Sequence, residues 1–147
     1  MKGKNVIWII VVLAIAVVGY YIWSEYNREN ADVSDSKADV TTSAASLIKE
    51  FADDSLTASK KYIDKTVLVS GEVKSVDTSG VISLGVAGDM SSVQCTMDKR
   101  HTLDYSTVKE GTTVSIKGKC SGYETQELLG TDVKMNFCVL QKQNKNL

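Results

Sequence analysis

One uncharged run constrains this chain more than any other feature of its sequence. Val6 to Trp23 are 18 consecutive residues without a charged side chain. As a helix they would extend roughly 27 Å, close to the thickness of the hydrocarbon core of a bilayer. Tryptophan and tyrosine residues lie toward both ends, where membrane interfaces favour them. The run therefore predicts a transmembrane anchor over residues 6–23, and its alternatives are a buried core helix and a cleavable signal peptide.

The flanks of the run favour an uncleaved anchor whose N-terminus stays inside the cell. The segment SEYNREN that follows has no A-x-A cleavage pattern, and no cysteine precedes Cys95, which argues against a lipid-modified N-terminus. Lys2 and Lys4 precede the run, and positive residues remain on the cytoplasmic side. We expect residues 1–5 in the cytoplasm and a single pass through a bacterial inner (cytoplasmic) membrane. The C-terminal domain would then be extracytoplasmic, or periplasmic.

The segment after the anchor predicts a linker and then a helix. Residues 24–42 hold five acids, two bases and almost no large aliphatic side chain, which is typical of an acidic flexible linker. From residue 44 the i, i+4 pairs Leu47/Phe51 and Ile48/Ala52 predict a helix. Asp54 or Ser55 can cap a new turn. Residues 44–63 are therefore either one helix with a break or two short helices.

The hydrophobic period then changes to two, which predicts β-strands. Gly71 inside the first of them suggests a bend or bulge, as small barrels need. A polar connection, residues 98–111, separates the third strand from the fourth. This order predicts a mainly β domain over residues 43–141, a five-stranded OB-type Greek-key barrel preceded by a short helix, with a tail over 142–147. The generic alternative is another small barrel or a β-sandwich. The predicted strands are residues 66–76, 81–86, 92–97, 113–123 and 131–141.

Four segments carry a resemblance to a known family. The most specific is K-E-G-x-x-V-x-I-K-G-K-C-x-G, from Lys109 to Gly122. The others span Ala58 to Val73, Val93 to Met97 and Asp132 to Leu140. Together, over residues 45–141, the sequence resembles the tRNA_anti-like OB-fold family of bacterial membrane-anchored and lipoprotein-like proteins. The resemblance implies an OB fold and a location at the cell surface, and it implies no particular site residues.

The residues give little support for nucleic-acid binding. OB domains that bind single strands use a positive groove and stacking aromatics, usually on the second and third strands. Residues 81–97 contain no Phe, Tyr, Trp, Lys or Arg, and the domain from Ser43 onward has 13 basic and 13 acidic side chains. Local basic positions nevertheless form a candidate anion-binding patch. The neutral domain favours the alternative, solvated charges that protect strand edges. The patch residues are Lys99, Arg100, Lys117, Lys119 and Tyr123.

No pattern predicts catalysis, a metal or a cofactor. His101 is the only histidine, and the sequence has no G-x-S-x-G, phosphate-binding loop, H-E-x-x-H or C-x-x-C motif. Outside the cytoplasm a disulfide is permitted. Cys120 and Cys138 come nearly opposite each other in a hairpin, although strand alternation puts them on different faces unless a bulge lies near Asn136. Cys95 with Cys120, or three buried reduced thiols, are the alternatives.

These features together predict a membrane-anchored, extracytoplasmic OB-fold binding or adaptor module rather than an enzyme. Its partners would be the membrane itself and an envelope protein, a glycan or a small ligand, and nucleic acid is not expected. The alternative is an OB protein that binds single-stranded oligonucleotides.

Overall fold

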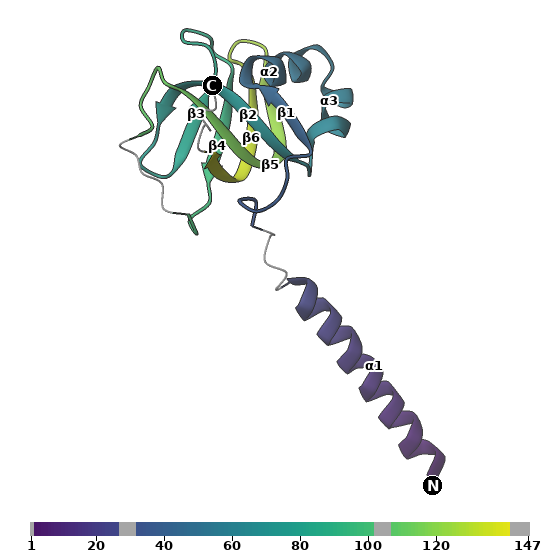
Figure 1. Ribbon diagram of the computed structural model, residues 1–147. Helices are drawn as coiled ribbons and strands as arrows, with labels where there is room; N and C mark the ends of the chain where they lie inside the picture. Colours follow the sequence, from purple (N-terminus) through teal and green to yellow (C-terminus); the bar gives the residue numbers. More distant parts are fainter. Residues whose placement is uncertain (1, 27–31, 102–106, 142–147) are drawn as a thin grey trace. The chain divides into compact units, whose positions relative to one another are not determined.

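The computed structural model describes residues 2–26, 32–101 and 107–141. It consists of two compact units, Met1–Ala31 and Asp32–Leu147. The first contains one long helix and the second contains a barrel with two short helices (Figure 1). The predicted tail, residues 142–147, and residues 27–31 of the predicted linker lie outside the described residues.

The first unit is the helix α1, Lys2–Tyr26, which contains the whole uncharged run. Every side chain described in it, from residue 3 to residue 25, is exposed. Residues Gly3–Glu25 are long and apolar enough to cross a membrane, by length and composition, and a signal sequence would have the same properties. A helix that is apolar on all sides has no polar face to turn toward water.

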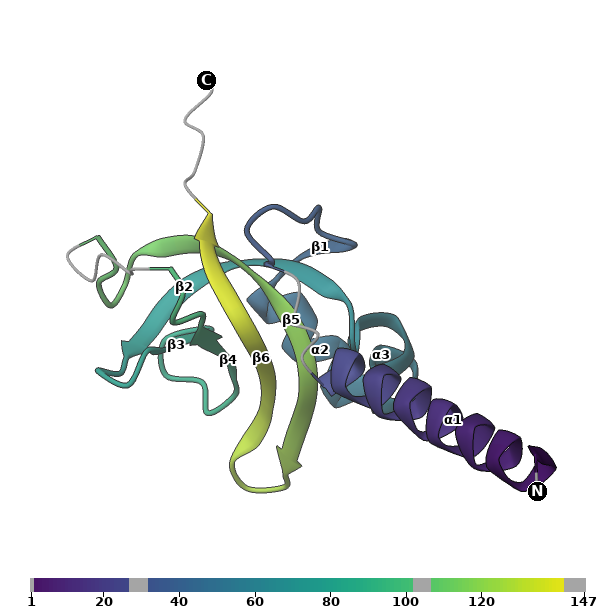
Figure 2. The same ribbon diagram turned by 90° about the horizontal axis from the view of Figure 1, so that it is seen from below.

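The second unit is a closed barrel of the predicted OB type, which confirms the fold class. Its strands are β2 Thr66–Val76, β3 Val81–Leu84, β4 Ser92–Met97, β5 Thr113–Gln126 and β6 Gly130–Gln141. They follow the order β2-β3-β4-β6-β5, and β5 returns to pair with β2, so the sheet closes (Figures 1 and 2). Closure pairs strand edges that would otherwise be exposed to other chains.

The period-two pattern places the apolar residues inside the barrel. Val67, Val69 and Val73 of β2 are buried, while the residues between them are partly or fully exposed. The same alternation buries Ile82 and Leu84 on β3. Because successive side chains of a strand point to opposite faces, one face of each strand supplies the core.

Two short helices cover the barrel, as the sequence permitted. In α2, Ala44–Asp53, the Ser43 side chain caps the first turn by accepting from the Ser46 amide at 3.2 Å. Asp54 ends this helix and caps α3, Ser55–Tyr62. Helix α2 buries Leu47 and Phe51 in the core.

A close approach of α2 to β2 explains the glycine in the middle of that strand. A Cβ on Gly71 would lie 2.7 Å from the Cβ of Ala44. Real Cβ atoms essentially never come this close, so only glycine fits here. The sequence had suggested a bend or bulge at Gly71; the register of β2 against β3 shifts nearby, between Val73 and Ser75.

The folded unit begins earlier than residue 43. Val40–Ser43 form β1, which pairs in parallel with β2, and Val33 is only 5% exposed. Val33 and residues 40–42 of β1 lie within residues 24–42, for which the composition predicts a linker. The β-branched residues Val40, Thr41 and Thr42 suit a strand, and the pairing depends on β2, which the local composition does not reveal.

A β-bulge in β6 turns its last buried residue inward. Met97 of β4 pairs with Cys138, whereas Cys95 pairs with Met135, so β6 contributes one extra residue. Phe137 in this bulge has a φ of 53°. The bulge moves Cys138 from the outward to the inward set, and its side chain is fully buried.

Candidate functional site

The segment that follows α1 in the sequence is fixed to the barrel by a buried lysine. The Nζ atom of Lys117 donates to the carbonyl oxygens of Ser34 at 2.9 Å and Ser36 at 2.8 Å. Lys117 is only 7% exposed, although β5 places it on the outward set of the strand. Residues 32–36 therefore cover it, and its ammonium group is used within the protein.

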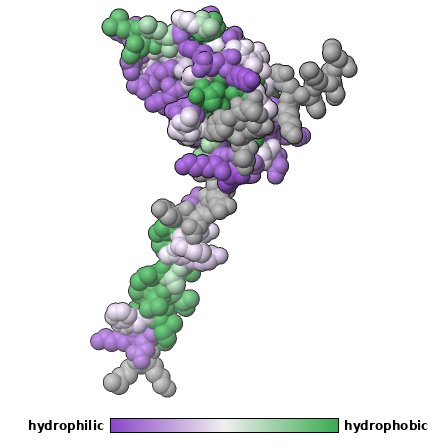
Figure 3. Space-filling view, turned by 90° about the vertical axis from the view of Figure 1, so that its left-hand side faces the viewer, coloured by the Kyte–Doolittle hydropathy of each residue, from purple (hydrophilic) through white to green (hydrophobic). Residues whose placement is uncertain are grey.

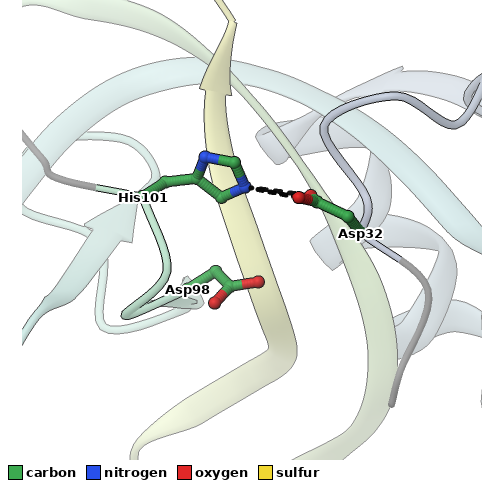
Figure 4. A group of neighbouring side chains, drawn as sticks. All are labelled: Asp32, Asp98 and His101. Carbon is green, nitrogen blue, oxygen red and sulfur yellow. Dashed lines mark hydrogen bonds and ion pairs between the residues drawn. The ribbon is translucent and has the colours of Figure 1, made fainter. Parts of the chain in front are cut away.

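Next to this segment, Asp32, Asp98 and His101 form a cluster of titratable side chains (Figure 4). The Nε2 atom of His101 lies 2.9 and 3.0 Å from the two carboxylate oxygens of Asp32. A hydrogen bond from the backbone amide of Ser34, followed by the bond with His101, holds the pKa of Asp32 well below its usual value. Asp98 follows β4 directly and is 6% exposed.

The donor types of this cluster are those of a metal site, since two carboxylates and an imidazole lie within 4.8 Å of one another. Arg100 already supplies a positive charge there. Its Nε and Nη2 atoms donate to Asp98 at 2.6 to 3.1 Å, and its backbone amide donates to the same carboxylate. These bonds hold the pKa of Asp98 below its usual value. The residues therefore fit a hydrogen-bonded network that joins residue 32 to the end of β4 better than a metal centre.

The structure gives most members of the predicted anion patch partners of their own. Arg100 is bound to Asp98, and Lys117 is covered by residues 32–36. Lys119 lies 3.7 Å from a carboxylate oxygen of Asp64. The ring of Tyr123 packs against Phe51, with 5.0 Å between ring centroids. Lys99 is exposed in the turn after β4. A ligand-binding role for these five residues stays a prediction.

Three cysteines from three adjacent strands lie in the core. Cys95, Cys120 and Cys138 are free thiols and fully buried. Burial raises the pKa of the Cys120 thiol to about 11. Hydrogen bonding with Cys95, together with burial, raises the pKa of Cys138 well above its usual value. Thiols of this kind are inert as nucleophiles, and the pairing of Cys120 with Cys138 stays a prediction.

The structure also reveals an exposed apolar surface that sequence reasoning missed. It lies on the β3–β4 loop, residues 85–91, and on the β5–β6 turn, residues 127–129, which share one end of the barrel (Figure 2). Figure 3 shows hydrophobic residues gathered at the top of the barrel. We call this surface the apolar tip. It consists of Val86 (56% exposed), Met90 (66%), Leu128 (89%) and Leu129 (55%).

Hydrogen bonds join the two halves of the apolar tip. The Thr131 amide donates to Ser91 Oγ at 3.1 Å. The Ser92 amide and hydroxyl donate to Asp132 at 3.0 and 2.7 Å. Gly130, with a φ of 83°, allows the close contact, because a Cβ there would lie 2.5 Å from Ser91 Oγ. The only sequence signal for this surface is a Leu-Leu pair in a turn, where polar residues are usual.

Comparison with known proteins gives one family and several distant structures. The sequence model of the family described as tRNA_anti-like matches residues 1–134. No curated protein matches this chain.

Three of the similar solved structures illustrate the range. Replication protein A of U. maydis bound to ssDNA is 16% identical, with 74% of this chain and 78% of that chain covered and a TM-score of 0.39. Telomere capping protein Ten1 from Saccharomyces pombe is 16% identical, with 74% of this chain and 86% of that chain covered and a TM-score of 0.39. OBody NL8 bound to hen egg-white lysozyme is 18% identical, with 54% of this chain and 98% of that chain covered and a TM-score of 0.34.

Proposed function

The chain belongs to the tRNA_anti-like family, and we propose that it is a membrane-anchored, extracytoplasmic OB-fold binding or adaptor module without catalytic activity. The observation that carries the proposal is α1. All of its described side chains are exposed, and this helix precedes a separate unit that has its own closed core. An uncharged apolar surface of this length is stable in lipid and not in water.

The charges on either side of the uncharged run support the orientation. Lys2 and Lys4 precede it, whereas three acids and one base, Glu25, Arg28, Glu29 and Asp32, follow it. Because positive residues remain on the cytoplasmic side, the barrel would lie outside the cytoplasm. In that compartment the barrel would contact an envelope protein, a glycan or a small ligand.

Membrane extraction and a topology reporter test the proposal. The full-length chain, expressed in bacteria, should remain in the membrane pellet after alkaline carbonate washing and keep an intact mass that includes α1. A C-terminal reporter that is active only outside the cytoplasm should be active. A soluble chain that has lost its first two dozen residues would establish a signal sequence instead. A reporter that is inactive outside the cytoplasm and a fusion that is active inside it would reverse the orientation.

A titration tests the alternative function, which is binding of single-stranded oligonucleotides. The full chain in detergent should show no salt-dependent binding of single-stranded DNA or RNA, because phosphate binding favours a basic domain and this one, from Ser43 onward, has 13 basic and 13 acidic side chains. In the described residues, Lys117, Lys119 and Arg100 already have partners within the protein. Binding that weakens steeply with added salt would favour the hypothesis that the protein binds oligonucleotides.

A further inference from the structure

We propose that the apolar tip binds a protein partner that presents apolar side chains flanked by basic residues. This inference rests on the proposed function, a binding module, and it names the surface and the chemistry of the partner. In the described part of the barrel unit, six large apolar side chains are exposed, and four of them form the apolar tip. Soluble surfaces usually carry such residues singly, so a concentration of this kind marks an interaction site.

The apolar tip is held in one shape before any partner arrives. The stem of Lys74 lies over Gly85, where an added Cβ would meet its Cδ at 2.9 Å. Its ammonium group donates to the carbonyl oxygens of Asp89 and Ser91 and so closes the β3–β4 loop. The bond from the Thr131 amide to Ser91 Oγ then fixes this loop to the β5–β6 turn. A surface ordered in this way loses little conformational entropy on binding.

The charges within the two loops determine which partner fits. Residues 85–91 and 127–129 contain two charged side chains, Asp89 and Glu127, and both are negative and exposed, whereas the nearby Lys74 ammonium group is bonded to loop carbonyls. Next to them, Glu124 is paired with Lys134 at 2.9 Å. Basic residues around an apolar centre would complement this arrangement.

The same charges argue against two other occupants. In a symmetric contact between two copies of this chain, the same patch would face itself, and Asp89 and Glu127 would meet like charges. A lipid surface is disfavoured because the loops contain no Lys, Arg, Trp or Tyr, the residues that hold proteins at anionic interfaces.

The apolar tip and the first described residue of the barrel unit lie at opposite ends of β4. Asp32, the first described residue of the barrel unit, bonds to His101, just beyond the C-terminal end of β4. The β3–β4 loop precedes β4, so the apolar tip lies at the other end of this strand. The two ends are separated by a six-residue strand, about 20 Å. Asp32 therefore lies at a distance from the apolar tip.

A peptide selection with matched variants tests the proposal. The full chain, inserted in phosphatidylcholine nanodiscs, would select from a random peptide library displayed on phage, after removal of phage that bind empty nanodiscs. We expect enriched peptides with apolar centres and flanking Lys or Arg. The affinity of the enriched peptides should fall at least tenfold in the variant Leu128→Ser/Leu129→Ser. It should fall about threefold or more in Asp89→Asn/Glu127→Gln and lose its salt dependence there.

The control variant is Leu56→Ser, because Leu56 is 75% exposed on α3, outside the apolar tip. It should leave peptide affinity unchanged. All of these side chains are exposed, so the unfolding midpoints should match that of the parent chain, which separates lost binding from lost folding.

Several results would overturn the proposal. The first two are an absence of peptides enriched over empty nanodiscs and equal affinity in the Leu128→Ser/Leu129→Ser variant. A dimer in light scattering that this variant dissociates would assign the surface to a second copy. A fluorophore on Leu128→Cys that spin-labelled lipids quench would assign it to the bilayer. Failure of membrane extraction would remove the proposed function, whereas peptide binding that ignores the apolar tip would remove only this assignment.

Discussion

Gly118 of β5 offers a sharp test of the packing around the buried cysteines. A Cβ at this position would lie 2.5 Å from Cys138 Sγ, 3.2 Å from Met135 Cε and 3.3 Å from the Asn136 carbonyl oxygen. Ordinary contacts begin at 3.4 Å, so the Cys138 sulfur would have to move by about 0.9 Å within a fully buried site. Overpacking of a core costs about 1–3 kcal/mol, and the reduced flexibility of the unfolded chain returns up to about 1 kcal/mol. We expect Gly118→Ala to lower the free energy of unfolding by about 1–2 kcal/mol.

A double-mutant cycle isolates the contact between the new methyl group and the sulfur. Because Cys138→Ala removes Sγ, the double variant Gly118→Ala/Cys138→Ala should lose at least about 0.5 kcal/mol less than the sum of the two single variants. The assay is chemical unfolding of the full chain in mild detergent with a reducing agent present, so that no disulfide contributes. Gly122→Ala on the same strand is the control, since nothing lies within 4 Å of its added Cβ. Additive single variants, or a Gly118→Ala chain as stable as the parent, would refute this account of the core.

Three further predictions concern one ion pair, the buried Lys117 and the core. Arg100 lowers the pKa of Asp98 below its usual 3.8, so the stability that this pair contributes is complete above that pH and is lost as the pH falls below it. Between about pH 5 and pH 3, the free energy of unfolding should therefore fall less steeply with decreasing pH in Asp98→Asn than in the parent. Lys117→Met removes the donor to two backbone carbonyls, so trypsin should cleave after the exposed Lys37 several times faster, as followed by mass spectrometry. Phe51→Ala, at a side chain 1% exposed, should cost about 3–5 kcal/mol in the same unfolding assay.

The strands were predictable because the alternation of apolar and polar residues is a local signal, and the barrel buries the apolar set. The predicted bounds of β2 and β4 agree with the structure, and β5 and β6 extend the predicted strands by three residues and one residue. The break at Asp54 was visible because an Asp side chain can accept the bond from the Thr57 amide. Local signals of this kind need no knowledge of distant partners.

What the sequence did not reveal depends on contacts between distant segments. Strand β1 exists through pairing with β2, 27 positions further along the chain at Val40 and Val67. Alternation places Lys117 on the outer face, but only the folded chain brings Ser34 and Ser36 over it. The apolar tip joins two loops about 40 residues apart through the bond between Ser91 and Thr131. None of these pairings leaves a periodic pattern.

Closure of the barrel limits where a partner can bind. On the strands, the inward residues form the core, and the outward Lys117 is already used to hold residues 32–36. A ligand that bound this lysine would have to break two hydrogen bonds to backbone carbonyls and leave those carbonyls without a donor, which costs free energy if they stay buried. At the apolar tip no such exchange is needed, because the exposed leucines, Leu128 and Leu129, lose only contact with water when a partner covers them. Binding at this end of β4 therefore has the lower cost, and it leaves the docked segment at the other end undisturbed.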